Sequence, residues 1–227
     1  MNILKASNYY CETEIALKAE FKNDKSNNVI LLGPGVFAQT KDISEFKKKY
    51  KKVIIFNQGQ LDNGLRTVID KKYFAYIKLA DEVWDYDEYN VEILKLIRPD
   101  IKFHPLKPCK ELNVGSKQKD IDVLFYGSLA IERRKKILDE LKEHNINVVI
   151  ANGKWGDELN DFIARAKICL NIHFFEKTAL QEQARLIKWV SSNSTIVSEI
   201  SRKNYLGVHE VPYNELVNEC LKILGKK

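Results

Sequence analysis

The sequence predicts an α/β protein with two domains, each built on a parallel β-sheet. Apolar runs of four to six residues alternate with segments of helical periodicity, which is the pattern of parallel strands joined by helices. A polar break near the middle of the chain separates two such series. The 227 residues, of which 44% are hydrophobic and 30% charged, form a globular composition that is long enough for two small domains.

The first half of the chain contains five predicted strands and four predicted helices. The two most apolar strands end at turn-forming residues, Gly33-Pro34-Gly35 in one case and Asn57–Gln60 in the other. The predicted strands are residues 2–6, 28–32, 52–56, 82–84 and 101–103. The predicted helices are residues 12–21, 43–50, 68–79 and 89–97.

The second half repeats this alternation after the polar break at residues 107–120, which contains Pro108, Gly115 and several lysines. We therefore predict domains at residues 1–115 and 116–227. Two Rossmann-like domains of this kind imply a cleft between two open sheets, with ligands beyond the carboxyl ends of the strands. The second half has predicted strands at residues 122–126, 147–150, 168–172 and 195–198, and predicted helices at residues 132–143, 157–167, 179–191 and 213–224.

Composition excludes several classes of protein. No run approaches the ~20 apolar residues of a membrane-spanning helix, and the first five residues lack the apolar core of a signal peptide. We therefore expect a soluble cytoplasmic protein without a membrane span. The four cysteines are widely scattered, which argues against a zinc ribbon or a redox motif. A formal charge of +6 permits an acidic partner without arguing for one.

The turn after the strand at 122–126 is the best candidate for a phosphate site. Neither GxGxxG nor GxxxxGK[ST] occurs, so any nucleotide site must use a less common loop. Gly127-Ser128 stands before a helix that carries Arg133 and Arg134. Glycine lets a ligand approach the backbone, and an arginine fork matches phosphate oxygens. The alternative is an ordinary turn followed by a solvated basic helix face.

Polar residues also follow the strand at 168–172. Asn171 and His173 would lie at the cleft, where His173 could bind a phosphate or hydroxyl or act as an acid or base. Glu182 and Arg185 are three residues apart on the next predicted helix and share a face. Glu182 could accept two ribose hydroxyls. The alternatives are a structural histidine and a plain surface ion pair.

The first half offers candidates for a base on the acceptor side. Asp62, in the loop after the strand at 52–56, and His104 are both possible, and the sequence does not choose between them. The acidic stretch from Asp81 to Asp87 fits a strand end and a helix cap better than a metal site. The lysines at 47–52 could meet nucleic acid phosphates or form a solvated face.

Four segments of the second half resemble, in order and spacing, the nucleotide-sugar-binding domain of compact bacterial and viral GT-B glycosyltransferases. The first half resembles them mainly in architecture. The chain departs from one large group in lacking the EX7E pattern, since the residue eight positions after Glu176 is Ala184. The four segments are Phe125-Tyr126-Gly127-Ser128 followed by Arg133, Leu170-Asn171-Ile172-His173, Glu182-Gln183-Ala184-Arg185 and Ile196-Val197-Ser198-Glu199.

The resemblance implies a role for each matching residue. Gly127, Ser128 and Arg133 would hold the donor diphosphate, and Glu182 with Arg185 would lie near ribose or phosphate. The remaining donor-pocket residues would be Asn152 beside the base, Asn171 and His173. The expected donor is a nucleoside diphosphate sugar, a UDP-sugar in the first place, and no metal is expected.

We therefore hypothesise a glycosyltransferase that transfers a sugar from a nucleotide sugar to a hydroxyl presented by the N-terminal domain. The acceptor would be a glycan or a hydroxylated base in DNA. The candidate catalytic residues are Asp62, His104 and His173. The rival hypothesis is a non-catalytic nucleotide-binding or interaction module that has the same fold.

Overall fold

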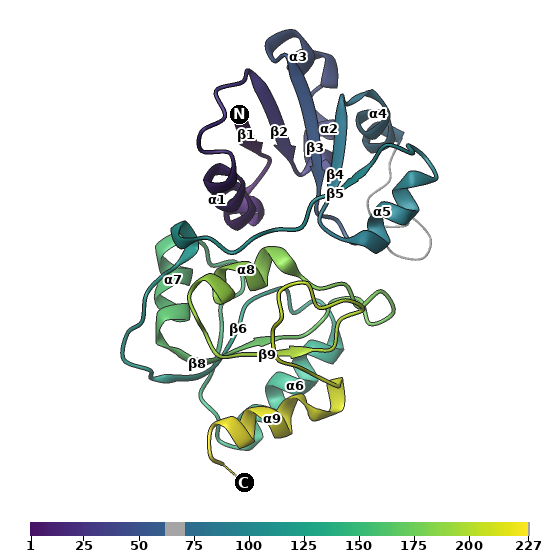
Figure 1. Ribbon diagram of the computed structural model, residues 1–227. Helices are drawn as coiled ribbons and strands as arrows, with labels where there is room; N and C mark the ends of the chain where they lie inside the picture. The colour runs from purple at the N-terminus through teal and green to yellow at the C-terminus, as the bar shows by residue number, and fades with distance from the viewer. Residues whose placement is uncertain (62–70, 227) are drawn as a thin grey trace. The chain divides into compact units, whose positions relative to one another are not determined.

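The computed structural model describes residues 1–61 and 71–226, which form two compact units, Met1–Lys107 and Pro108–Lys227 (Figure 1). Each unit has its own five-stranded sheet in which all neighbouring strands are parallel. The predicted fold class, α/β with two parallel sheets, is therefore confirmed.

The first sheet has the strand order β1-β2-β3-β4-β5, so strands that are consecutive in sequence are neighbours in space. Its strands are β1 (Asn2–Lys5), β2 (Asn28–Leu32), β3 (Lys52–Asn57), β4 (Glu82–Asp85) and β5 (Lys102–Phe103). Its helices are α1 (Cys11–Glu20), α2 (Pro34–Thr40), α3 (Ile43–Lys49), α4 (Lys71–Leu79) and α5 (Glu88–Lys95).

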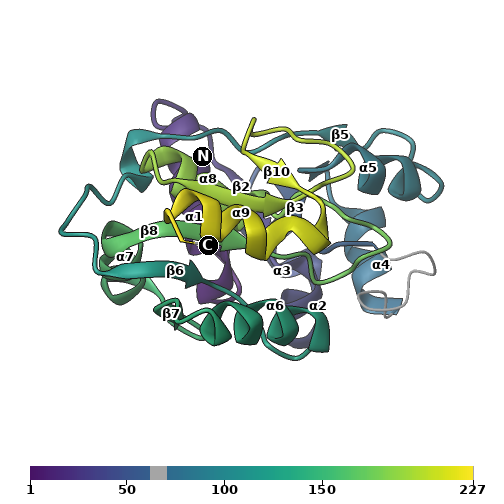
Figure 2. The same ribbon diagram turned by 90° about the horizontal axis from the view of Figure 1, so that it is seen from below.

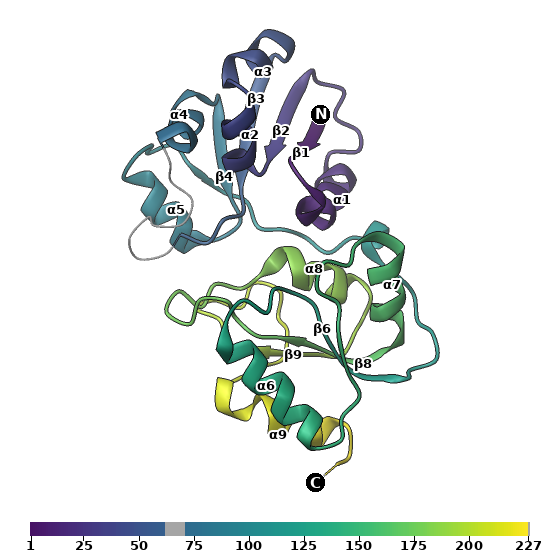
Figure 3. The same ribbon diagram turned by 180° about the vertical axis from the view of Figure 1, so that it is seen from behind.

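The core of the first unit explains why its strands are continuous apolar runs. Val29 and Leu31 of β2 pack with residues of α2, α3, α4 and α5, whereas Ile30 and Leu32, also fully buried, point to the opposite face. The view from behind shows α2 and α3 in front of the strands (Figure 3). Because both faces of the central strands are covered, apolar side chains occupy both faces of each of these strands.

The second sheet has the order β10-β9-β8-β6-β7. Its strands are β6 (Ile121–Phe125), β7 (Val148–Ile150), β8 (Ala166–Asn171), β9 (Ile196–Glu199) and β10 (Glu210–Val211). Its helices are α6 (Glu132–Glu143), α7 (Gly156–Arg165), α8 (Gln183–Ser191) and α9 (Leu216–Ile223). Short 3-10 helices occur at Asn8–Tyr10, Lys110–Leu112 and Tyr213–Glu215.

Two apolar clusters cover the two faces of the second sheet. One contains Phe125 and Leu170 together with residues of α6 and α9, and the other contains Leu124 and Cys169 together with residues of α7 and α8. Figure 2, seen from below, shows α6 and α9 in front of this sheet. The sheet therefore presents its polar residues at its strand ends rather than on its faces.

The main differences from the predicted elements lie at turns. Residues 34–40 form the unpredicted helix α2, which begins after Gly33, whose φ of 84° suits glycine. Helix α8 begins at Gln183 rather than at 179, because Ala179 has φ 44° and Glu182 occupies the N-cap. The short edge strand β10 was not predicted. Residues 68–70 of one predicted helix lie outside the described residues.

Residues 108–115 were predicted to end the first domain, but they cluster with the second unit. The backbone N–H of Cys109 donates to Ser191 Oγ at 3.1 Å, and that of Val114 donates to Ser192 Oγ at 3.2 Å. Leu112 between them is 1% exposed. Contacts with the end of α8, which are distant in sequence, therefore decide where this segment belongs.

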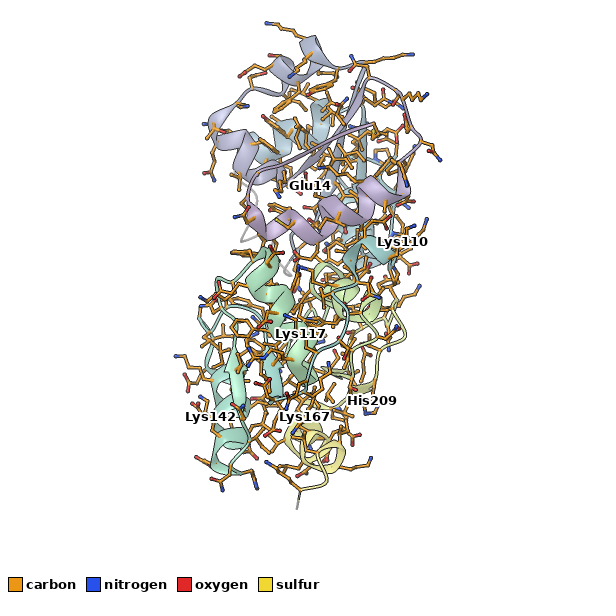
Figure 4. The ribbon with its side chains drawn as sticks, turned by 90° about the vertical axis from the view of Figure 1, so that its left-hand side faces the viewer. Glu14, Lys110, Lys117, Lys142, Lys167 and His209 are labelled. Atoms are coloured by element: carbon orange, nitrogen blue, oxygen red, sulfur yellow. The ribbon has the colours of Figure 1, made fainter. Side chains whose placement is uncertain are left out.

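Several basic side chains on the surface form ion pairs with nearby carboxylates. In the second unit, Lys117 pairs with Asp161 at 2.7 Å, Lys142 with Asp139 at 2.6 Å, and Lys167 with Asp122 at 2.6 Å (Figure 4). In the predicted cluster at 47–52, Lys47 pairs with Asp81 at 2.9 Å and Lys52 with Glu82 at 2.5 Å. No helix in the described residues is long and apolar enough to span a bilayer.

Candidate functional site

The carboxyl ends of β6, β8 and β9 bring together charged and amide side chains in the second unit. Gly127 follows β6, Asn171 ends β8 and Glu199 ends β9. Helix α6 adds Arg134, and Arg185 lies in the first turn of α8. Parallel strands place these residues at one edge of the sheet although they span more than 70 positions of sequence, from 127 to 199.

Glu182 lies at the centre of this group. It is the N-cap residue of α8, and its side chain is 12% exposed. One carboxylate oxygen accepts from Arg134 Nη2 at 3.0 Å and the other from Arg185 Nη1. Burial opposes ionisation, but the guanidinium groups of Arg185 and Arg134 prevail and hold the pKa of Glu182 below its ordinary value. The carboxylate is therefore ionised at neutral pH.

Arg134 is a buried support for this edge. Its side chain is 1% exposed, and Nε and Nη2 donate to the carbonyl of Ile172 at 2.9 and 2.7 Å. Nη1 donates to the carbonyl of Ser128 at 3.0 Å. The sequence placed Arg134 together with Arg133 in the candidate phosphate site, but it did not predict that Arg134 is buried against Ile172 and Glu182. The available signal was its helical phase, since it shares the buried face of α6 with Ile137, Leu138 and Leu141.

Arg185 lies against the Gly127 turn. Its Nη1 donates to Asn171 Oδ1 at 2.8 Å, and its guanidinium lies 5.9 Å from the ring centres of Phe125 and Tyr126. A Cβ at Gly127, where φ is 153°, would come within 2.7 Å of Arg185 Nη2. Glycine is therefore needed for this approach. The structure thus brings together four predicted residues, namely Gly127, Asn171, Glu182 and Arg185.

Arg133 points to a different partner. It forms a two-pronged ion pair with Glu199, with Nη1 at 2.8 Å from Oε2 and Nη2 at 2.6 Å from Oε1. Nη1 also donates to the carbonyl of His173 at 2.8 Å, and the guanidinium lies 4.4 Å from the Tyr213 ring centre. Sequence reasoning assigned no role to Glu199, although an acid directly after an apolar strand is the same signal that marked Asn171.

His173 is fully buried next to this pair. Its backbone N–H donates to Glu199 Oε2 at 2.9 Å, and its Nε2 lies 3.1 Å from the carbonyl oxygen of Ile200. Its Nδ1 is buried without a hydrogen-bond partner among residues 1–61 and 71–226. The imidazole is thus held on one side and has a polar atom available on the other.

Ser128 and Asn152 are more peripheral. Ser128 is exposed, and its Oγ accepts from the N–H of Ala130 at 3.2 Å. Asn152 is exposed in the turn after β7, which is the strand at one end of the sheet. Two aromatic residues near that turn, Tyr126 and Trp155, meet edge to face with ring centres 5.7 Å apart. Tyr126 is 9% exposed and Trp155 is half-buried, and the two form an aromatic corner beside the polar edge.

In the first unit, His104 directly follows β5 and stacks on Trp84, with ring centres 4.6 Å apart. His104 Nε2 lies 3.1 Å from Glu20 Oε2, and Lys107 Nζ lies 2.9 Å from Glu20 Oε1. Burial opposes ionisation of Glu20, yet Lys107 and His104 outweigh it and lower the pKa of its carboxyl. Asp62, the other predicted base, lies outside the described residues.

The carboxyl end of the first sheet holds a polar network that sequence reasoning did not identify. Asn57 Nδ2 donates to Asp85 Oδ2 at 2.5 Å, Asn90 Nδ2 donates to Asp85 Oδ1 at 3.2 Å, and Tyr73 Oη donates to Asn57 Oδ1 at 2.8 Å. Burial raises the pKa of Asp85 well above its ordinary value, although the donors from Asn57, Asp87 and Asn90 act in the opposite direction.

The acidic stretch around this network is structural. Asp85 ends β4, and Asp87 is the N-cap of α5, where it accepts from the N–H of Tyr89 at 2.8 Å. No group of three or more His, Cys, Asp or Glu side chains in the described part of the chain could hold a metal ion.

No protein-family model matches the chain. An uncharacterised protein of Acanthamoeba polyphaga mimivirus is 27% identical over 205 residues, a match that covers 84% of this chain and 64% of the viral protein. A second uncharacterised mimivirus protein is 28% identical over 204 residues, covering 83% and 22% of the two chains. The chain therefore spans less than two thirds of the length of these relatives.

Among solved structures, S. aureus TarM, a GT-B glycosyltransferase, superposes with a TM-score of 0.57 at 12% identity. The match covers 95% of this chain and 52% of TarM, in a complex with UDP, alpha-GlcNAc-glycerol and Fondaparinux. The chain has a GT-B fold. A second TarM structure matches with a TM-score of 0.50 at 13% identity, covering 94% and 51% of the two chains. The GT-B resemblance read from four sequence segments is therefore confirmed at the level of fold.

Proposed function

We propose that this protein is a glycosyltransferase that binds a nucleoside diphosphate sugar at the carboxyl edge of its second sheet. The observation that carries the proposal is the contact of Gly127, Asn171, Glu182 and Arg185 at one edge of a GT-B fold. A neighbour of the same fold was solved in complex with UDP. A UDP-sugar is accordingly the first donor to test.

The diphosphate is assigned to the Gly127-Ser128 turn and Arg185. Arg185 uses Nη1 for Asn171 and Glu182, while Nη2 lies at the glycine turn, where backbone can approach a ligand closely. A guanidinium offers donors in a planar fork that matches phosphate oxygens. A positive group fixed at this place would stabilise the negative charge that develops on the departing diphosphate.

Glu182 is assigned to the ribose. Each of its oxygens accepts one hydrogen bond from an arginine. A carboxylate has about four acceptor sites, so capacity is left for two hydroxyl donors. Its lowered pKa keeps it ionised and therefore acceptor-only at neutral pH. The aromatic corner of Tyr126 and Trp155, next to Asn152, is the corresponding place for the base.

The first unit is assigned to the acceptor, a hydroxyl of a glycan. A base there would take the acceptor proton, and His104 is the candidate among the described residues. Its contact with the ionised Glu20 orients the imidazole. Asp62 is the alternative base that the sequence suggests.

The binding test is a calorimetric panel of UDP, GDP, ADP, CDP and dTDP with their sugar forms. UDP should bind, and Arg185→Met should weaken it by about 1.5–3 kcal/mol, the range for hydrogen bonds to charged groups. Lys135→Met removes a cation from the exposed side of α6 and is the matched control. Its affinity should equal that of the wild type. Failure of every nucleotide to bind would overturn the proposal.

The proposed contact between Glu182 and the ribose can be tested by comparing the affinities for UDP and 2′-deoxy-UDP. The wild type should prefer UDP to 2′-deoxy-UDP, because one hydroxyl donor is lost in the deoxy form. Glu182→Gln should reduce that preference, since the amide keeps only one acceptor oxygen. Equal affinity of the wild type for UDP and 2′-deoxy-UDP would remove Glu182 from the ribose.

Turnover separates an enzyme from a binding module. With the correct sugar donor and a glycan acceptor, the wild type should release nucleoside diphosphate, and His104→Gln should slow the release without changing nucleotide affinity. Tight nucleotide binding without release from any donor would establish the non-catalytic alternative.

A further inference from the structure

We infer that Arg133 and Glu199 are a positioning pair that sets the orientation of His173 in the proposed donor site, rather than ligands of the diphosphate. The inference rests on the proposed function for its link to nucleotide binding. Its structural part, the fixed orientation of His173, stands on contacts within the second unit and can be tested without any ligand.

The pair contacts the backbone of His173 on both sides. Glu199 Oε2 accepts the N–H of His173 at 2.9 Å, and Arg133 Nη1 donates to the carbonyl of His173 at 2.8 Å. The ion pair between Arg133 and Glu199 joins these two contacts into one ring. Because Arg133 comes from α6 and Glu199 from β9, residue 173 is held relative to two separate elements.

The side chain of His173 is fixed by a third contact. Its Nε2 lies 3.1 Å from the carbonyl of Ile200, the residue after Glu199. A carbonyl oxygen only accepts, so Nε2 must carry the hydrogen. In the neutral imidazole Nδ1 is then an acceptor, and it is buried without a partner among the described residues. Fixing a buried group with one polar atom free is how a site is preorganised for a ligand.

The geometry also explains why Arg133 is not a phosphate ligand. Both of its terminal nitrogens are bound to Glu199, one of them also to His173, and its guanidinium covers the Tyr213 ring. The Oη of Tyr213 donates to the carbonyl of Arg133 at 2.7 Å, which holds this turn of α6 in place. The side chains of Arg133 and Glu199 are 16% and 9% exposed. A phosphate would have to displace a buried carboxylate.

The first test determines the tautomer of the His173 imidazole by NMR. In the long-range ¹H–¹⁵N spectrum of the unliganded full chain, His173 should show a single Nε2–H tautomer, with its signals assigned by their absence in His173→Gln. Arg133→Met and Glu199→Gln should each replace this pattern with tautomer averaging. Lys135→Met, an exposed cation on the same helix, should leave it unchanged. An unaltered His173 pattern in both variants of the pair would overturn the inference.

The second test is a double-variant cycle in UDP affinity. Arg133→Met and Glu199→Gln should each weaken UDP binding about fivefold, and the double variant should be no weaker than either, because neighbouring residues that act as one unit are not additive. A loss in Arg133→Met alone, with unchanged or tighter binding in Glu199→Gln, would make Arg133 a direct ligand and overturn the inference. Unchanged binding in both would also overturn it.

The two tests keep this inference separate from the proposed function. If the wild type binds no nucleotide, the proposed function fails while the tautomer test still decides whether the pair orients His173. If UDP binds and Arg185→Met weakens the binding as expected, the proposed donor site is supported. The cycle then decides the role of Arg133 alone.

Discussion

The carboxyl ends of the two sheets differ in their polar residues: one has partly exposed ion pairs, and the other has a buried hydrogen-bond network. In the second unit the edge is made of ion pairs between Arg133, Arg134, Arg185 and the carboxylates of Glu182 and Glu199. The side chains of Arg185 and Glu182 remain 13% and 12% exposed.

In the first unit the corresponding edge is a sealed network of Asn57, Asp85 and Asn90, all at most 1% exposed. Burial raises the pKa of the Asp85 carboxyl in this network well above its ordinary value.

This difference in exposure suits the second edge to ligand binding and the first edge to support of the backbone. A charged group that still reaches solvent can meet an anionic ligand, whereas a sealed network can only hold the backbone around it. The first network does this, since Asn90 Oδ1 accepts from the N–H of Leu61 at 3.0 Å and Asn90 Nδ2 donates to the carbonyl of Gly59 at 2.9 Å. It therefore fixes Gly59 and Leu61, which follow β3.

The largest expected effect comes from removing the buried cation of the charged edge. Arg134→Met should lower the free energy of unfolding by about 3–5 kcal/mol, because it leaves the buried carbonyl of Ile172 without its donors and one carboxylate oxygen of Glu182 without its arginine partner. Urea denaturation measures it. Lys136→Met, an exposed lysine two positions further on α6, should change stability by less than about 0.5 kcal/mol. Equal stability of the two variants would show that the edge does not depend on this ion pair.

The glycine turn is the next most sensitive point. Gly127→Ala should cost about 1–3 kcal/mol in strain and should also weaken UDP binding, because the new Cβ displaces Arg185. Gly153→Ala is the matched control. Its φ of 71° is also positive, but a Cβ there meets nothing within 4 Å in the described residues. UDP titrations of both variants give the comparison, and equal affinities would contradict the proposed place of Arg185.

The raised pKa of Asp85 should make the stability of the protein depend on pH. The folded chain keeps the Asp85 proton above the unfolded pKa of ~3.9, so unfolding releases a proton in the window from there up to the raised folded pKa. Stability should therefore fall as pH rises through this window, by up to about 1.4 kcal/mol per pH unit. Asp85→Asn cannot titrate and should flatten this part of the profile. Identical profiles for wild type and variant would show that Asp85 titrates normally.

The smallest expected effect concerns α5, the helix that follows β4. Asp87→Ala removes the N-cap acceptor of α5 and should cost ~1 kcal/mol, whereas Asp87→Ser should retain most of the stability. Thermal denaturation of the two variants checks this. A loss in Asp87→Ser as large as in Asp87→Ala would mean that the carboxylate contributes more than a cap.

Much of the site could be located from the sequence because strand ends are local features. The apolar runs ending at Phe125 and Ile172 place Gly127, Asn171 and His173 at one edge of a parallel sheet, and the spacing of Glu182 and Arg185 places both on one face. Edge strand β10 has only two residues, too few for a periodic signal, and α2 begins where Gly33-Pro34-Gly35 reads as a turn.

The sequence by itself determined the α/β class, the parallel sheets and the edge that carries the polar residues, because these follow from the order of apolar and polar positions along the chain. Only the tertiary structure decided which partner each arginine of α6 contacts. Arg133 and Arg134 are adjacent and chemically identical, but α6 turns one toward Glu199 and buries the other against Ile172 and Glu182. Such partners are set by packing between distant segments, which no local pattern records.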